Sequence, residues 1–78
     1  MLTKVLLKKI WLIIEQLEEE VLHLTDLELI QTIESLIAIE VVLDRTEIKA
    51  VSEYIQPRVP IIRDLVEVQS IKLKKSVN

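Results

Sequence analysis

TDLELIQTIESLIAIEVVL, residues 25–43, has the clearest helical pattern in the chain. Its apolar residues recur at three- and four-residue steps, as on the buried face of an amphipathic helix. Thr25 with Glu28 three positions later is typical of a capping box, in which each side chain accepts a hydrogen bond from the other residue's backbone N–H. We therefore expect a helix over residues 26–43. Its apolar stripe comprises Leu29, Ile30, Ile33, Leu36, Ile37 and Val41.

The segment before Thr25 predicts another long helix, over residues 2–24. Its apolar residues again recur at three- and four-residue steps and share one face. That face comprises Leu6, Ile10, Ile13, Leu17, Val21 and Leu24.

A short helix is expected over residues 47–56. Asp44-Arg45 interrupts the preceding pattern, and Thr46 is of a residue type that caps helices well. Pro57 is predicted to end this helix, because the residue before a proline disfavours the helical conformation.

The C-terminal part predicts a fourth helix, over residues 60–73. Pro60 suits a first helical turn, and the apolar residues after it can share one side. A β-strand is the alternative for residues 61–73, because Ile and Val are enriched there and Val66-Glu67-Val68 alternates. Residues 74–78 are expected to fray.

The four predicted helices indicate an all-α fold class. The chain has 78 residues, 34 of them Leu, Ile or Val, and this length allows one domain, over residues 1–78. We predict a small helical bundle of about four helices. A chain this short buries only about 60% of its unfolded surface, so its high apolar content favours a homo-oligomer in which another copy completes the bundle.

Missing residue types exclude several functions. The chain lacks cysteine, which rules out disulfides and thiolate chemistry, and it lacks glycine, which rules out the usual phosphate-binding loops. His23 is the only histidine, so a catalytic dyad has no spare base. We therefore expect that the protein is not an enzyme and that it binds no cofactor.

Apolar residues outside the two long stripes predict a contact surface for another protein. Trp11, Leu12 and Leu22 lie off the stripe of residues 2–24, and Ile39 and Val42 lie off that of residues 26–43. Trp is also enriched among the residues that dominate binding energy at interfaces. The predicted interface comprises Trp11, Leu12, Leu22, Ile39, Glu40 and Val42.

Glu40 belongs to that set because it falls within the apolar stripe of its helix. A buried, unpaired carboxylate is strongly unfavourable. We therefore expect Glu40 to pair with a basic residue or to lie at the polar rim of an interface, with a metal site as the alternative.

Charge is distributed in blocks along the chain. Residues 1–14 carry three lysines and no acid, residues 15–44 carry nine acids and no Lys or Arg, and residues 45–78 carry seven bases and four acids. Two antiparallel copies of the first helix would place Lys4, Lys8 and Lys9 opposite glutamates of the partner. Such complementarity sets orientation more than affinity.

Two other functions remain open. The segment around residues 27–56 could form a helix-turn-helix for DNA, although its acidic neighbourhood makes nucleic acid an unfavoured partner. Glu20 and His23 match the Glu-x-x-His ligand pair of four-helix di-iron proteins, which here would need a dimer to supply the remaining ligands.

Targeting signals are not expected. The longest unbroken apolar run near the start, Ile10 to Ile14, is shorter than a signal-peptide core, and a membrane span needs about 20 apolar residues. The prediction is a cytoplasmic protein without a transmembrane segment.

Overall fold

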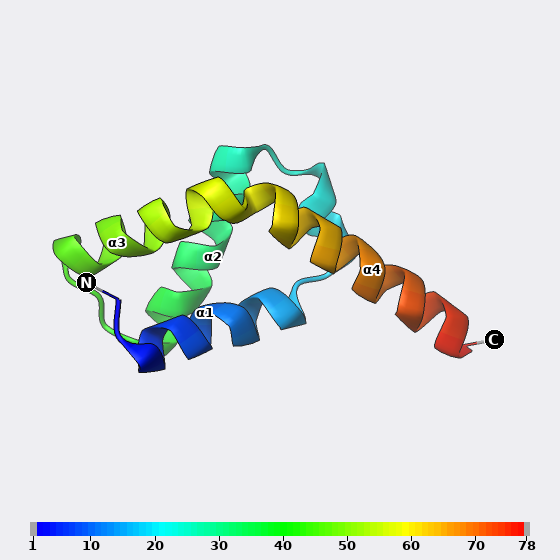
Figure 1. Ribbon diagram of the computed structural model, residues 1–78, viewed down its shortest axis with the longest axis horizontal. Coiled ribbons are helices and arrows are strands. Elements are labelled where there is room, and N and C mark those ends of the chain that lie inside the picture. The colour runs from blue at the N-terminus through cyan, green and yellow to red at the C-terminus, as the bar shows by residue number, and fades with distance from the viewer. Residues whose placement is uncertain (1, 78) are drawn as a thin grey trace.

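The structure is a computed structural model that describes the backbone of residues 2–77 and the side chains of residues 2–71 (Figure 1). It contains α1 (Lys4–Gln16), α2 (Asp26–Glu40), α3 (Arg45–Ile55) and α4 (Val59–Val77), with the short 3₁₀ helices η1 (Glu19–His23) and η2 (Gln56–Arg58) between them. Residues 2–77 contain no β-strand. The all-α prediction is therefore confirmed, and the strand alternative for residues 61–73 is wrong. The side chains of the predicted frayed tail, residues 74–78, lie outside the described part.

The second half of the chain forms one bent arm rather than two separate helices. α3, η2 and α4 follow one another directly, and Figure 1 shows them as one continuous arm that bends between α3 and α4, passes over α2 and has α1 below it. Pro57 lies in η2, where a tight 3₁₀ turn accommodates the missing N–H without a loop. The molecule thus consists of three helical arms, where the sequence predicted four separate helices.

α1 is shorter than the predicted helix over residues 2–24. It begins after Thr3, whose hydroxyl accepts a hydrogen bond from the Leu6 N–H, and it ends where Leu17 becomes extended. Glu18, Glu19 and Glu20 follow directly. Carboxylates at a helix C-terminus are opposed by the helix dipole and by one another, so the glutamate run favours a break at this point.

Arg63 on α4 holds the segment after the break. Its guanidinium donates to the backbone oxygens of Leu22 and Leu24, at 3.3 and 2.7 Å, and pairs with Asp26 at 2.9 Å. Val21, Leu22 and Leu24 pack against the core from this segment rather than from a continuous first helix. The last turns of the predicted helix over residues 2–24 are therefore absent, and a separate segment held by Arg63 takes their place.

Capping boxes begin both α2 and α3. At α2 the Thr25 hydroxyl accepts from the Glu28 N–H at 3.2 Å, and the Glu28 carboxylate accepts from the Thr25 N–H at 3.0 Å, as predicted. At α3 the cap is Asp44 with Glu47, not Thr46. α3 consequently begins at Arg45, while α2 ends at Glu40 because Val41 is extended.

The core is entirely aliphatic. It contains Leu6, Ile10, Ile13, Ile14, Leu17, Leu29, Ile30, Ile33, Ile37, Val51, Ile55, Val59, Ile62 and Val66. No polar or charged residue among the described side chains is buried. Leu36, which the stripe of residues 26–43 placed inward, is exposed, as are Ile48 on α3 and Leu65 on α4, because this arrangement leaves flanks of α2, α3 and α4 uncovered.

The helices also bear on the membrane prediction. α4, the longest, has 19 residues and includes Arg63, Asp64 and Glu67. No helix of the described part is long and apolar enough to cross a lipid bilayer.

The first capping box predicts a pH dependence of stability. Hydrogen bonds from the Thr25 backbone and then from its hydroxyl lower the pKa of Glu28 below its ordinary value of 4.5. The ionised carboxylate therefore stabilises the fold above pH 4.5, and this contribution disappears as the pH falls through the lowered pKa. Urea denaturation should show that Glu28→Ala destabilises the protein at about pH 7 and much less at about pH 2. An equal loss of stability at both values would contradict a role for the ionised carboxylate.

Candidate protein-docking surface

Exposed aliphatic side chains are the main chemical feature of the surface. Eleven large ones are exposed among the described residues: Val5, Leu12, Leu27, Leu36, Ile39, Val42, Ile48, Ile61, Leu65, Val68 and Ile71. Isolated apolar residues are ordinary on any protein surface, whereas contiguous ones mark contact sites. A candidate contact site therefore requires that several of these eleven side chains lie next to one another.

One group surrounds a groove between α1 and α2. The groove has a volume of about 300 Å³ and is lined by Ile13, Gln16, Leu17, Leu36, Ile39 and Glu40. Leu12 adjoins it on the outer side of α1, since it precedes Ile13 and lies one turn before Gln16. We call these seven residues the α1–α2 surface. Ile39 is 79% exposed and Leu12 47% exposed, so the apolar groups are available for contact.

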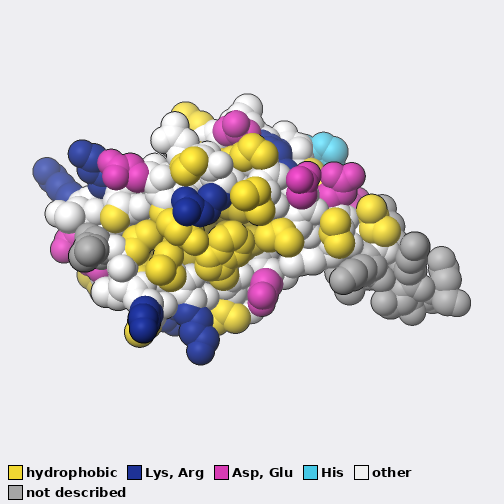
Figure 2. Space-filling view, viewed as in Figure 1, with side chains coloured by type: hydrophobic (Ala, Val, Ile, Leu, Met, Phe, Trp, Pro, Cys, Tyr) yellow, Lys and Arg dark blue, Asp and Glu magenta, His cyan; other side chains and the backbone are white. Residues whose placement is uncertain are grey.

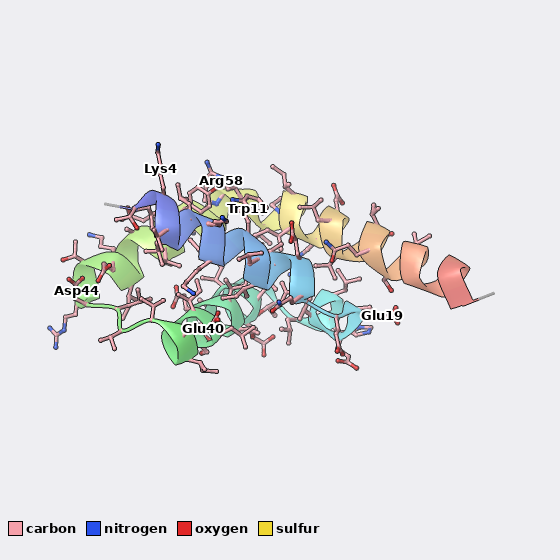
Figure 3. The ribbon with its side chains drawn as sticks, turned by 90° about the horizontal axis from the view of Figure 1, so that it is seen from below. Lys4, Trp11, Glu19, Glu40, Asp44 and Arg58 are labelled. Carbon is pink, nitrogen blue, oxygen red and sulfur yellow. The ribbon has the colours of Figure 1, made fainter. Side chains whose placement is uncertain are left out.

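A loose ion pair lies at the edge of this surface. Lys9 Nζ is 4.0 Å from Glu40 Oε1, and both side chains are open to solvent, with 34% and 52% of their areas exposed. Figure 3 shows Glu40 on the α2 side of the molecule, away from the labelled side chains of Trp11 and Arg58. Glu40 is thus a polar group beside apolar residues, and it is not buried as a position within the apolar stripe had suggested.

This placement predicts a small effect of neutralising Glu40. Glu40→Gln should change the free energy of unfolding by less than about 1 kcal/mol, because exposed ion pairs contribute little. Thermal melting with and without a chelator would measure this, with Glu53→Gln on α3 as the matched exposed control. A chelator-dependent shift of several degrees in the wild type alone would instead indicate a bound metal at Glu40.

The six predicted interface residues occupy different places in the structure. Leu12, Ile39 and Glu40 belong to the α1–α2 surface, and Val42 follows two residues after Glu40 and is 94% exposed. Leu22 packs partly against the core within the segment that Arg63 holds. Trp11 also packs against the core, on another side of α1. The structure therefore brings Ile39 and Glu40 together at the groove, with Leu12 one helical turn from the lining residue Gln16.

Trp11 makes its contacts within the chain. Its indole N–H donates to the Tyr54 hydroxyl at 2.8 Å, and the two rings meet edge to face. The Arg58 guanidinium lies over the Tyr54 ring, 3.9 Å from its centroid, and donates to the Tyr54 carbonyl. These contacts join α1 to the α3–α4 bend. The helical wheel could not reveal them, because Trp11 and Tyr54 are 43 residues apart.

Loss of the Tyr54 hydroxyl should therefore weaken the fold. Tyr54→Phe leaves the partly buried Trp11 N–H without its acceptor and should cost about 1 kcal/mol in the free energy of unfolding. Urea denaturation followed by Trp11 fluorescence measures it, and Tyr54→Leu should cost more because the ring contacts go as well. An unchanged midpoint in Tyr54→Phe would show that water replaces the hydroxyl fully.

Sequence reasoning missed a second group of exposed apolar residues, which we call the α4 strip. Ile61, Leu65 and Val68 recur at four- and three-residue steps, so they share one side of α4, and all three are exposed. Figure 2 shows hydrophobic side chains gathered across the face between α1 and the α3–α4 arm. The sequence analysis predicted that the apolar residues after Pro60 share one side of a helix, but it did not predict that this side is exposed.

The α2–α3 pair has the spacing of a helix-turn-helix without a basic reading face. Residues 41–44 join the helices, a length that such motifs use. On α3, Arg45 and Lys49 are offset by Glu47 and Glu53. DNA binding relies on a net positive surface against the phosphates, so this geometry does not favour DNA.

The predicted metal ligands are not gathered into a site. Glu20 and His23 lie in η1, and both are exposed. The described residues include no group of three His, Cys, Asp or Glu side chains that could hold a metal ion.

Comparisons with known proteins were made at the level of sequence and of fold. No protein-family model matches the chain, and neither a curated protein nor a solved structure is significantly similar to it. The α1–α2 surface must therefore be interpreted from its own chemistry.

Proposed function

We propose that the chain is a non-catalytic protein-interaction module that acts through the α1–α2 surface. The observation that carries the proposal is the exposure of Ile39 in an apolar groove, together with that of Leu12 one helical turn from the lining residue Gln16. Complete burial of one such side chain contributes roughly 1.5–3 kcal/mol. A partner that covers this surface therefore gains a favourable free energy that the isolated chain lacks.

The surrounding groups support a protein as the partner. Gln16 and Glu40 border the apolar groove, and Lys9 lies beside them. An apolar centre with a polar border is the usual arrangement of protein interfaces.

Among the described side chains, the α4 strip does not line the hollows found beside α4. The hollows that reach α4 are lined by Val66 or by Glu67 and their neighbours, and none of the strip's three side chains lines either one. A concave apolar surface gives a partner more contact than an exposed helix ridge does, which makes the α1–α2 surface the better docking site.

Location and partner belong to the same proposal. We propose that the module acts in the cytoplasm. Fractionation of cells that carry a tagged chain would test this location. The partner can be sought without prior identification by comparing the proteins that co-purify with paired variants.

The decisive comparison uses two double variants of matched chemistry. Leu12→Gln with Ile39→Gln should abolish specific co-purification, because polar groups replace the two most accessible parts of the apolar surface. Ile61→Gln with Leu65→Gln on α4 should leave it within about twofold of wild type. Glutamine is a good helix former, so both variants should keep their helical circular dichroism.

Two results would contradict the proposal. Loss of binding only in the α4 variant would move the docking site to α4. Equal binding by wild type and both variants would show that neither apolar surface is used.

A further inference from the structure

We infer that the α1–α2 surface binds a second copy of this chain, with the two α1 helices packed antiparallel about a two-fold axis near Leu12. This inference rests on the proposed function and names the partner. It follows from the charges on the outer side of α1, from the position of Leu12 between them, and from the area that a stable dimer requires.

The outer side of α1 is charged in a self-complementary way. Lys8 and Glu15 are both exposed, and neither forms an ion pair within the described residues. They lie seven residues apart and so share one side of the helix. Lys9, by contrast, already pairs with Glu40. The free charges of α1 therefore run from positive near its beginning to negative near its end.

An antiparallel arrangement uses both charges. Lys8 lies four residues before Leu12 and Glu15 three residues after it. When two copies cross at Leu12 in opposite directions, Lys8 of each copy faces Glu15 of the other. A parallel pair would instead place Lys8 against Lys8 and Glu15 against Glu15, which is unfavourable. A two-fold axis produces the favourable contact twice, as in other isologous dimers.

Area explains why the interface includes α2. α1 has 13 residues and is about 20 Å long, whereas a stable interface buries roughly 800 Å² on each partner. One exposed helix side of this length is too small to supply that area. A two-fold axis perpendicular to the plane of the paired α1 helices keeps both α2 helices on one side of that plane, so Ile39 and Leu36 can widen the contact. Figure 3 shows α1 lying in front of the other helices, with its outer side uncovered.

Charge reversal provides the test. Lys8→Glu alone would set two carboxylates against each other across the dimer, and Glu15→Lys alone would set two ammonium groups against each other. Sedimentation velocity from micromolar to submillimolar concentrations should show a wild-type dimer whose Kd rises about tenfold or more in each variant. An equimolar mixture of the two variants should restore dimers. Both contacts of the mixed dimer pair a carboxylate with an ammonium group, whereas a dimer of either variant alone contains two contacts between like charges.

Loss of helix cannot explain the expected result. A new acid near the beginning of α1 and a new base near its end both suit the helix dipole. Lys49→Glu and Glu53→Lys on α3 are the matched controls, since they change net charge equally on another exposed helix. Both controls should retain the wild-type Kd.

The outcomes separate this inference from the proposed function. A monomeric wild type at submillimolar concentration would overturn the dimer, yet co-purification that depends on Leu12 and Ile39 would leave the interaction module standing with a different protein. A dimer insensitive to both reversals, or a mixture that fails to recover, would overturn the antiparallel geometry. Dissociation of the dimer by the control substitution Lys49→Glu would also overturn the antiparallel geometry.

Discussion

Burial of the apolar side of α2 is the constraint on which the rest of the structure depends. Leu29, Ile33 and Ile37 are completely buried, and α1, α3 and α4 all pack against this helix. Since the core contains only aliphatic side chains, its stability comes from close packing and from removal of apolar surface from water. α1 and the bent α3–α4 arm are therefore arranged around α2 rather than as equivalent members of a bundle.

The same constraint explains the exposed apolar surface. α1 and the α3–α4 arm cover α2 on its inner side, but they leave apolar residues on the outer flanks of α1, α2 and α4 exposed. Polar links, such as Arg63 to the segment after α1 and Trp11 to Tyr54, join the arms to one another. The groove between α1 and α2 has the loose Lys9–Glu40 pair at its edge, which leaves Ile39 exposed. A partner surface is consequently the simplest physical account of why aliphatic residues persist there.

Local signals in the sequence predicted the helices well where they were chemically specific. The Thr25–Glu28 capping box and the periodic apolar residues after it correctly located the beginning and the buried side of α2. Asp44 and Glu47 form an equivalent box, whose Asp-x-x-Glu spacing is present in the sequence, so the prediction of Thr46 as the cap was wrong. The break after Gln16 was also open to prediction, because a run of glutamates is unfavourable at a helix C-terminus.

Sequence alone thus determined the helical class, most of the aliphatic core positions of α1 and α2, and the exposed state of Leu12, Ile39 and Val42. The stripes omitted buried Ile14 and wrongly included exposed Leu36. Periodicity within one helix specifies which residues share a side, and that is local information. Only the tertiary structure decided what covers each side. Trp11 lies against Tyr54 and Leu65 lies in solvent because the bent α3–α4 arm reaches one flank of α1 and exposes its own outer flank. Such contacts depend on residues about 40 positions apart, and no helical wheel contains them.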